Sequence, residues 1–215
     1  MTMKWSSYAL NRYIAPKLAD LERNLAPEVI SQFDQAKYWV GNFIFNSILR
    51  VQVKEPWRKY IFNFLRCVQT ALHEYECGRG SLDEYLAGRR EAISRYFMTV
   101  LHFETSVAHA YQAYMLGRNI LEKDKLFTKG DGSPLERLNR IYNHTKHYES
   151  VIAAGQLPDD ATIPLWITND SLECSEVSLS FDEFAYLLVA LGKAADQLSN
   201  PPLPSDQADQ TSINK

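Results

Sequence analysis

The sequence predicts a mainly α-helical protein: a helical bundle followed by a small C-terminal β-hairpin and a final helix. Three observations support this fold class. Apolar residues recur every three or four positions over most of the chain. The serine–x–x–glutamate pattern of a helix N-terminus occurs at 81–84, 133–136 and 180–183. Short runs that favour β-structure come only after Gly155.

Length and composition indicate one domain. A chain of 215 residues with 46% apolar and 23% charged residues can fill one well-packed core. We expect a single helical domain over residues 1–199. Within it we expect an N-terminal helical extension (1–55), a bundle core (56–155) and a hairpin plus helix (160–199). Residues 200–215, rich in Pro, Ser, Asp and Gln, predict a disordered tail.

The first third of the chain predicts three helices. Helical spacing of apolar residues favours helices over Tyr8–Leu25 and Val29–Val51, with Pro27 placed to open the second. Pro56 then opens a third helix, whose apolar stripe ends at Gly78.

The middle of the chain predicts one very long helix. The Ser81–Glu84 pattern is typical of a capping box, in which a serine and a glutamate satisfy each other's backbone amides. We expect the helix to run from there toward Phe127, with Gly88 and Gly117 as points of interruption. Residues 128–132 form a turn-rich break.

The last third predicts two helices separated by a hairpin. Ser133–Glu136 combines a second capping box with proline at the first helical position, which favours a helix from Pro134 to about Ala154. Residues 162–168 and 172–179 are expected to form the hairpin. A third capping box, Ser180–Glu183, opens an amphipathic helix that reaches Leu198.

Charge and motif content narrow the function classes. The net charge of -3 and the pI of about 6.0 exclude a global basic field, so any contact with phosphate must come from a local patch. The N-terminus does not match a signal peptide, and no run of about 18 apolar residues is present, which predicts a cytoplasmic protein with no membrane contact.

No metal or cofactor is predicted. The three cysteines form no CxxC pair, and the sequence has no HExxH, P-loop, GxGxxG or GxSxG motif.

The helix that starts at Pro134 carries an unusual stripe of polar residues. Because an α-helix turns by about 100° per residue, five of its side chains fall within about 120° of one another, beside the apolar face. These five are Arg137, Arg140, Asn143, His144 and His147. Arginine offers a fork of donors for phosphate, and a histidine exchanges protons near neutral pH. The stripe therefore suits an anion and permits metal-independent RNA cleavage; the alternative is that it only forms salt bridges and caps.

The stripe resembles the signature of the HEPN superfamily (higher eukaryotes and prokaryotes nucleotide-binding domains), whose members are helical bundles. Arg140 is separated by six residues from His147, as Arg137 is from His144, and either pair fits the family's arginine-to-histidine spacing. The ending Asn143-x-x-Lys146-His147 also looks like bacterial HEPN-like proteins.

The resemblance implies a function and a set of roles. Many HEPN members are metal-independent endoribonucleases of toxin–antitoxin, phage-defence or RNA-processing systems and act as dimers. It implies RNA or a nucleotide as ligand, a homodimer and an antitoxin-like protein partner. Arg137, Arg140 and Lys146 would hold phosphate. The catalytic group would be Arg140, His147, His144 and Asn143, with one histidine as general acid or base and Asn143 orienting it.

A second function stays open, namely a noncatalytic helical module for protein interaction. Active HEPN members commonly place Asn, Asp or His directly after the arginine, whereas here Leu138 and Ile141 stand there. The preceding helix adds His102, Glu104 and His109, and we expect Glu104 to pair with the arginines and orient them; the alternative is a polar flank of the bundle.

Overall fold

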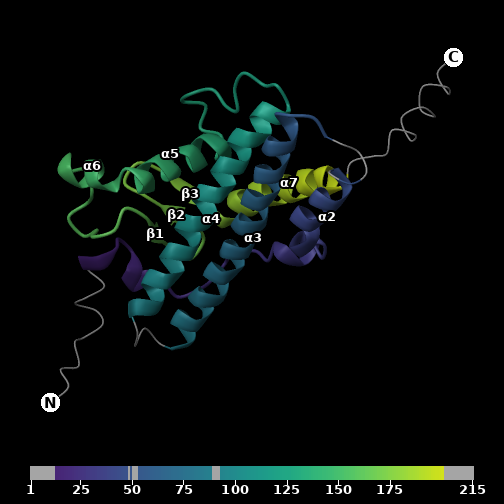
Figure 1. Cartoon of the computed structure of the whole chain (residues 1–215). Helices are drawn as coiled ribbons and strands as arrows, with labels where there is room; N and C mark the ends of the chain where they lie inside the picture. The colour runs from purple at the N-terminus through teal and green to yellow at the C-terminus, as the bar shows by residue number, and fades with distance from the viewer. Residues whose placement is uncertain (1–12, 48, 50–52, 89–92, 201–215) are drawn as a thin grey trace.

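The computed structural model describes residues 13–47, 49, 53–88 and 93–200, and it confirms the mainly α fold class with a small C-terminal sheet before the last helix (Figure 1). The expected tail beyond Asn200 and the start of the first expected helix lie outside the described residues. The helices are α2 (Trp39–Asn46), α3 (Trp57–Ala87), α4 (Ile93–Ile120), α5 (Pro134–Lys146), α6 (Tyr148–Ala153) and α7 (Phe181–Ser199). Among the described helices, none is long and apolar enough to cross a membrane.

Helices α3 and α4 pack along their lengths as a helical hairpin (Figure 1). They approach closely at Gly78, where an added Cβ would lie 3.2 Å from the ring of Phe103. About one turn after Phe103 on α4, the Ser106 hydroxyl donates to the Ala71 carbonyl oxygen of α3 at 2.8 Å. Small residues on α3 thus let a large ring on α4 fill the space between the helices.

The sequence predicts that the helix opened by Pro56 ends at Gly78 and that a new helix begins at Ser81. Both predictions are wrong. Helix α3 continues to Ala87, since Leu82 and Tyr85 extend its buried stripe against the bundle. Tertiary packing therefore outweighs the local capping signal, which is a weak preference on its own.

The first expected helix, Tyr8–Leu25, is wrong beyond Ile14. After Ile14 the chain forms only a short 3₁₀ helix, Leu18–Asp20, and then runs without regular structure. The side chain of Asn169 explains part of this path, because its Oδ1 accepts hydrogen bonds from the amides of Glu22 (2.8 Å) and Arg23 (2.7 Å). Amides that bond to a distant side chain are not available to a helix.

The second expected helix, Val29–Val51, is broken into pieces. It begins as 3₁₀ helices Ile30–Gln32 and Ala36–Tyr38 and becomes α-helical only in α2. A carboxylate of α3 binds the amides at the start of this segment, because Glu76 Oε1 accepts hydrogen bonds from the backbone N–H of Val29 (2.8 Å) and Ile30 (3.1 Å).

The hairpin region forms a three-stranded antiparallel sheet. Its strands are β1 (Trp166–Ile167), β2 (Ser171–Glu173) and β3 (Ser178–Ser180), in the order β1-β2-β3. Ile167 pairs with Leu172, which pairs in turn with Leu179, so one apolar row faces the core. The expected second strand, 172–179, is divided by a turn.

Helix α7 begins at the capping box that the sequence predicts. Ser180 Oγ accepts from the Glu183 amide and Glu183 Oε2 accepts from the Ser180 amide, both at 3.2 Å. The first residue of α7, Phe181, packs on Phe103 with ring centroids 5.3 Å apart. Tyr75 of α3 contacts both Phe103 and Phe184 at 5.8 and 5.6 Å, so one aromatic cluster joins α3, α4 and α7.

We expect Gly78→Leu to destabilise the fold by about 1–3 kcal/mol, because the larger side chain must displace the Phe103 ring. The matched control is Gly80→Leu on the same helix, where an added Cβ meets no atom within 4 Å. The control should gain up to about 1 kcal/mol from helix propensity. Urea denaturation measures both, and equal stabilisation by the two changes would contradict the close approach.

Candidate anion-binding groove on helix α5

The start of α5 is fixed by one buried carboxylate. Ser133 Oγ accepts from the Glu136 amide at 3.2 Å, as predicted. The Glu136 carboxylate does not complete the capping box; instead it accepts from the amides of Gly130 (2.6 Å) and Gly132 (2.7 Å). Both glycines have positive φ, 84° and 65°, which other residues rarely adopt. Glu136 therefore fastens the preceding turn onto the first turn of α5.

The end of α5 differs from the prediction. The expected helix to Ala154 breaks at His147, whose φ of -113° and ψ of 33° separate α5 from the short α6. His147 is exposed at this break. The five-residue stripe is therefore regular only from Arg137 to His144, and the angular position expected for His147 does not apply.

A groove of about 710 Å³ lies along α5, and we call it the motif groove. It brings together three of the expected site residues, Arg140, Asn143 and His144, but not Arg137, Lys146 or His147. The remaining lining residues come from the preceding turn, α5 itself, α6 and its end, and the β2–β3 turn: Phe127, Lys129, Gly130, Glu136, Asn139, Val151, Gln156 and Glu176.

The two arginines are held by different carboxylates. Arg137 forms an ion pair with Glu183, the capping residue of α7. Arg140 Nη2 lies 3.0 Å from Glu176 Oε2 in the β2–β3 turn, with side chains 44% and 45% exposed. An ion pair this exposed contributes little to stability, so the Arg140 guanidinium is available to a competing anion.

His144 is the buried member of the stripe. Only 5% of its surface is exposed, and its Nε2 has no hydrogen-bond partner among the described residues. Burial lowers the pKa of its imidazole, while the carboxylate of Glu176 opposes that effect. The ring is thus neutral at pH 7, the form that accepts a proton. Next to it, the Asn143 amide donates to Asn139 Oδ1 at 3.2 Å.

Lys146, expected to bind phosphate, faces another part of the surface. Its ammonium lies 5.6 Å from the centre of the Tyr142 ring. It borders a separate hollow of about 560 Å³, which Asn143 also lines. Lys129, from the turn before α5, is the lysine that lines the motif groove.

Glu104 makes no hydrogen bond or ion pair with a motif arginine in the described part of the chain. Burial raises the pKa of its carboxyl to about 7. The orienting contacts to the arginines come instead from Glu176 and Glu183. His102, two residues before Glu104 on α4, contacts Glu74 of α3, and His102 Nδ1 lies 2.7 Å from Glu74 Oε2.

The sequence analysis did not predict that Glu176 and Glu183 pair with the arginines. Glu183 could have been found, because the capping box that it completes was predicted. Glu176 stands in a turn between two short strands, and no local pattern relates it to Arg140, 36 residues earlier.

The chain matches no protein-family model, no curated protein and no solved structure with significance. Within the described ranges, no group of three or more His, Cys, Asp or Glu side chains is placed to hold a metal ion.

We expect His144→Gln to reduce the loss of stability on acidification. The folded-state pKa of His144 lies below its ordinary value of 6.5. The stability linked to it is therefore present above about pH 6.5 and is lost as the pH falls, because the unfolded chain binds the proton more readily. Between pH 7.5 and 5.5 the variant should lose up to about 1 kcal/mol less than the wild type.

The variant must be compared with the wild type, because Glu104 changes the pH dependence of stability in the opposite direction to His144. Its raised pKa removes stability as the pH rises through about 7. His147→Gln, at an exposed site, is the matched control and should change the profile less. Identical pH profiles for His144→Gln and the wild type would contradict the buried neutral imidazole.

Proposed function

We propose that this protein is a HEPN-like RNA- or nucleotide-binding protein that holds a phosphate in the motif groove. The observation that carries the proposal is the position of Arg140. Its half-exposed guanidinium lines a groove of about 710 Å³ together with Asn143 and His144.

Phosphate binding at Arg140 requires an exchange of partners. Glu176 occupies the guanidinium in the structure, at 3.0 Å. Two oxygens of a phosphate match the arginine fork, and a terminal phosphate of a nucleotide also carries more charge than one carboxylate. The ammonium of Lys129 and the amide of Asn143 add donors in the same groove.

Metal-independent RNA cleavage is the catalytic form of this proposal. A neutral imidazole, His144, accepts the proton of a ribose 2′-hydroxyl. The 2′-oxygen attacks phosphorus to form a 2′,3′-cyclic phosphate, and the 5′-oxygen leaves with a proton from a second group. His147, exposed at the end of α5, is the candidate for that donor. Arg140 stabilises the charge on the phosphate.

A noncatalytic interaction module is the second candidate, and the Arg137–Glu183 ion pair favours it. This pair links α5 to the capped N-terminus of α7, so Arg137 has a structural role without any ligand. In this alternative the stripe closes a salt-bridge network and the groove receives a protein partner.

We further propose that the protein forms a homodimer in the cytoplasm and binds an antitoxin-like protein partner, as in toxin–antitoxin systems. Three exposed apolar side chains on α4 support a protein contact, since Phe97, Met98 and Leu101 are 42%, 47% and 51% exposed. Residues three and four apart share one face of a helix, so these side chains form a single patch.

The test of binding uses fluorescent single-stranded RNA and fluorescence anisotropy. We expect Arg140→Ala to weaken binding about 10- to 100-fold, the effect of losing a charged hydrogen bond. Glu176→Gln should tighten binding, because it removes the competing carboxylate.

The matched control is Arg58→Ala. Arg58 also forms an exposed ion pair, with Glu55 at 2.6 Å, and it does not line the groove. It removes the same net charge, so equal weakening by Arg58→Ala and Arg140→Ala would show nonspecific attraction and contradict the proposed site.

The same RNA in EDTA tests cleavage. Release of 2′,3′-cyclic phosphate ends that His144→Ala and His147→Ala abolish, while binding persists, would support the nuclease. RNA binding without cleavage would support the noncatalytic binding form. Absence of both binding and cleavage would contradict the proposal and favour the interaction module.

A further inference from the structure

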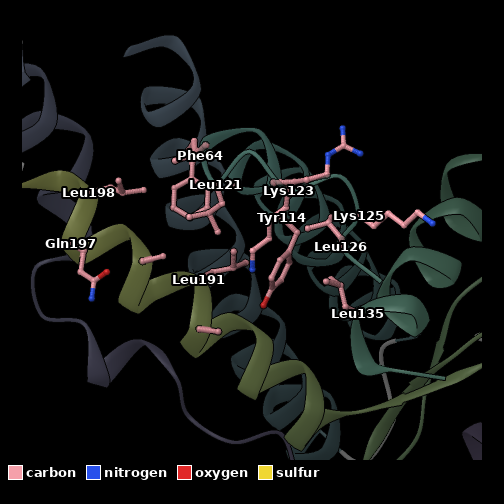
Figure 2. A pocket seen from close by; sticks show the side chains of 15 residues that line it. Phe64, Tyr114, Leu121, Lys123, Lys125, Leu126, Leu135, Leu191, Gln197 and Leu198 are labelled. Atoms are coloured by element: carbon pink, nitrogen blue, oxygen red, sulfur yellow. The ribbon is translucent and has the colours of Figure 1, made fainter. Parts of the chain in front are cut away.

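Another pocket, of about 390 Å³, has a mostly apolar lining (Figure 2). The end of α4, the loop that follows it and the last turns of α7 form most of its wall. Its apolar lining includes Phe64, Leu121, Leu126, Leu135, Leu191 and Leu198. We call it the α4–α7 pocket. Its volume lies within the range of small-molecule sites.

Small residues create the space. Gly117 on α4 and Ala190 and Ala194 on α7 line the pocket without filling it. An added Cβ at Gly117 would lie 3.4 Å from the ring of Phe64 on α3, so α3 and α4 are already in contact beside the pocket. The Tyr114 hydroxyl donates to the Leu187 carbonyl oxygen at 3.0 Å. This hydroxyl therefore holds α4 to α7, and the Tyr114 ring adds to the apolar wall.

Three cations line the same pocket: Arg118, Lys123 and Lys125. None of them forms an ion pair with a carboxylate in the described part of the chain. The carboxylates of Glu122 and Asp124, on the same loop, do not line the pocket. In Figure 2 the side chain of Lys123 reaches across the pocket toward Leu191, whereas Lys125 points outward. A mostly apolar pocket is thus lined by three cations that form no ion pair with Glu122 or Asp124.

We propose that the α4–α7 pocket binds an amphipathic anion of the fatty-acid type, with the alkyl chain inside and the carboxylate at Arg118 and Lys123. The positive charge of the lining residues decides between ligand classes. A neutral apolar ligand would leave these cations unused, and a cationic amphiphile would be repelled. The enclosed volume suits one short alkyl chain. The site is independent of the motif groove, since the two sets of lining residues do not overlap.

The test is isothermal titration of the full chain with straight-chain carboxylates below their micelle concentration. From hexanoate to dodecanoate, each added methylene should tighten binding about fourfold until the pocket is full. Dodecylamine should bind at least tenfold more weakly than dodecanoate, and dodecanol should fall between them. Affinity that does not depend on chain length, or equal affinity for the amine and the acid, would overturn the proposal.

Paired variants locate the site. Ala194→Phe fills the pocket and should abolish dodecanoate binding, whereas Ala153→Phe adds the same ring on the exposed side of α6 and should not. Lys123→Glu should weaken binding at least tenfold. Lys193→Glu, an equal charge change at an exposed position outside the pocket, should leave binding unchanged.

Three results separate this proposal from its competitors. Binding that survives Lys123→Glu and Ala194→Phe, with circular dichroism showing both variants folded, would overturn it. If Ala194→Phe does not fold, Lys123→Glu against Lys193→Glu still decides. Binding of an acidic amphipathic peptide but not dodecanoate would assign the pocket to a protein partner and also overturn it. Arg140→Ala should leave dodecanoate affinity unchanged, whatever its effect on RNA.

Discussion

The close approach of α3 and α4 at Gly78 is the constraint on which the rest of the structure depends. It admits the Phe103 ring between the helices. Phe103 in turn packs on Phe181, the first residue of α7. That contact sets the position of the Ser180 cap, and Glu183 of this cap holds Arg137 of α5. The helix with the arginine and histidine stripe is therefore positioned, step by step, by a glycine on α3.

This arrangement gives the two arginines different capacities. Arg137 is committed to the junction of α5 and α7, where release would expose an unpaired carboxylate beside a helix cap. Arg140 shares a half-exposed pair with Glu176, a contact that costs little to replace. Neutral His144 lies one helical turn further on and lines the same groove. Arg140 is therefore the arginine proposed to bind phosphate, whereas Arg137 has a structural role.

The sequence predicted elements whose signals are local and missed those that depend on distant contacts. Helix α7 begins where its capping box predicts, because Ser180 and Glu183 satisfy each other's amides within one turn. The box at Ser81 failed, since packing of α3 on α4 continues through it. In the candidate site, Arg140 and His144 share a groove as spacing suggested. Glu176 could not be foreseen, because only the fold brings its turn to α5.

The central claim is that Arg140 contacts a phosphate, and the salt dependence of RNA binding tests it most directly. Each phosphate that a protein neutralises on a single strand contributes about -0.7 to the slope of log K against log salt concentration. The account predicts that Arg140→Ala makes the slope less steep by about 0.7, while Arg58→Ala leaves it unchanged. An unchanged slope for Arg140→Ala would contradict the phosphate contact and, with it, the proposed role of the motif groove.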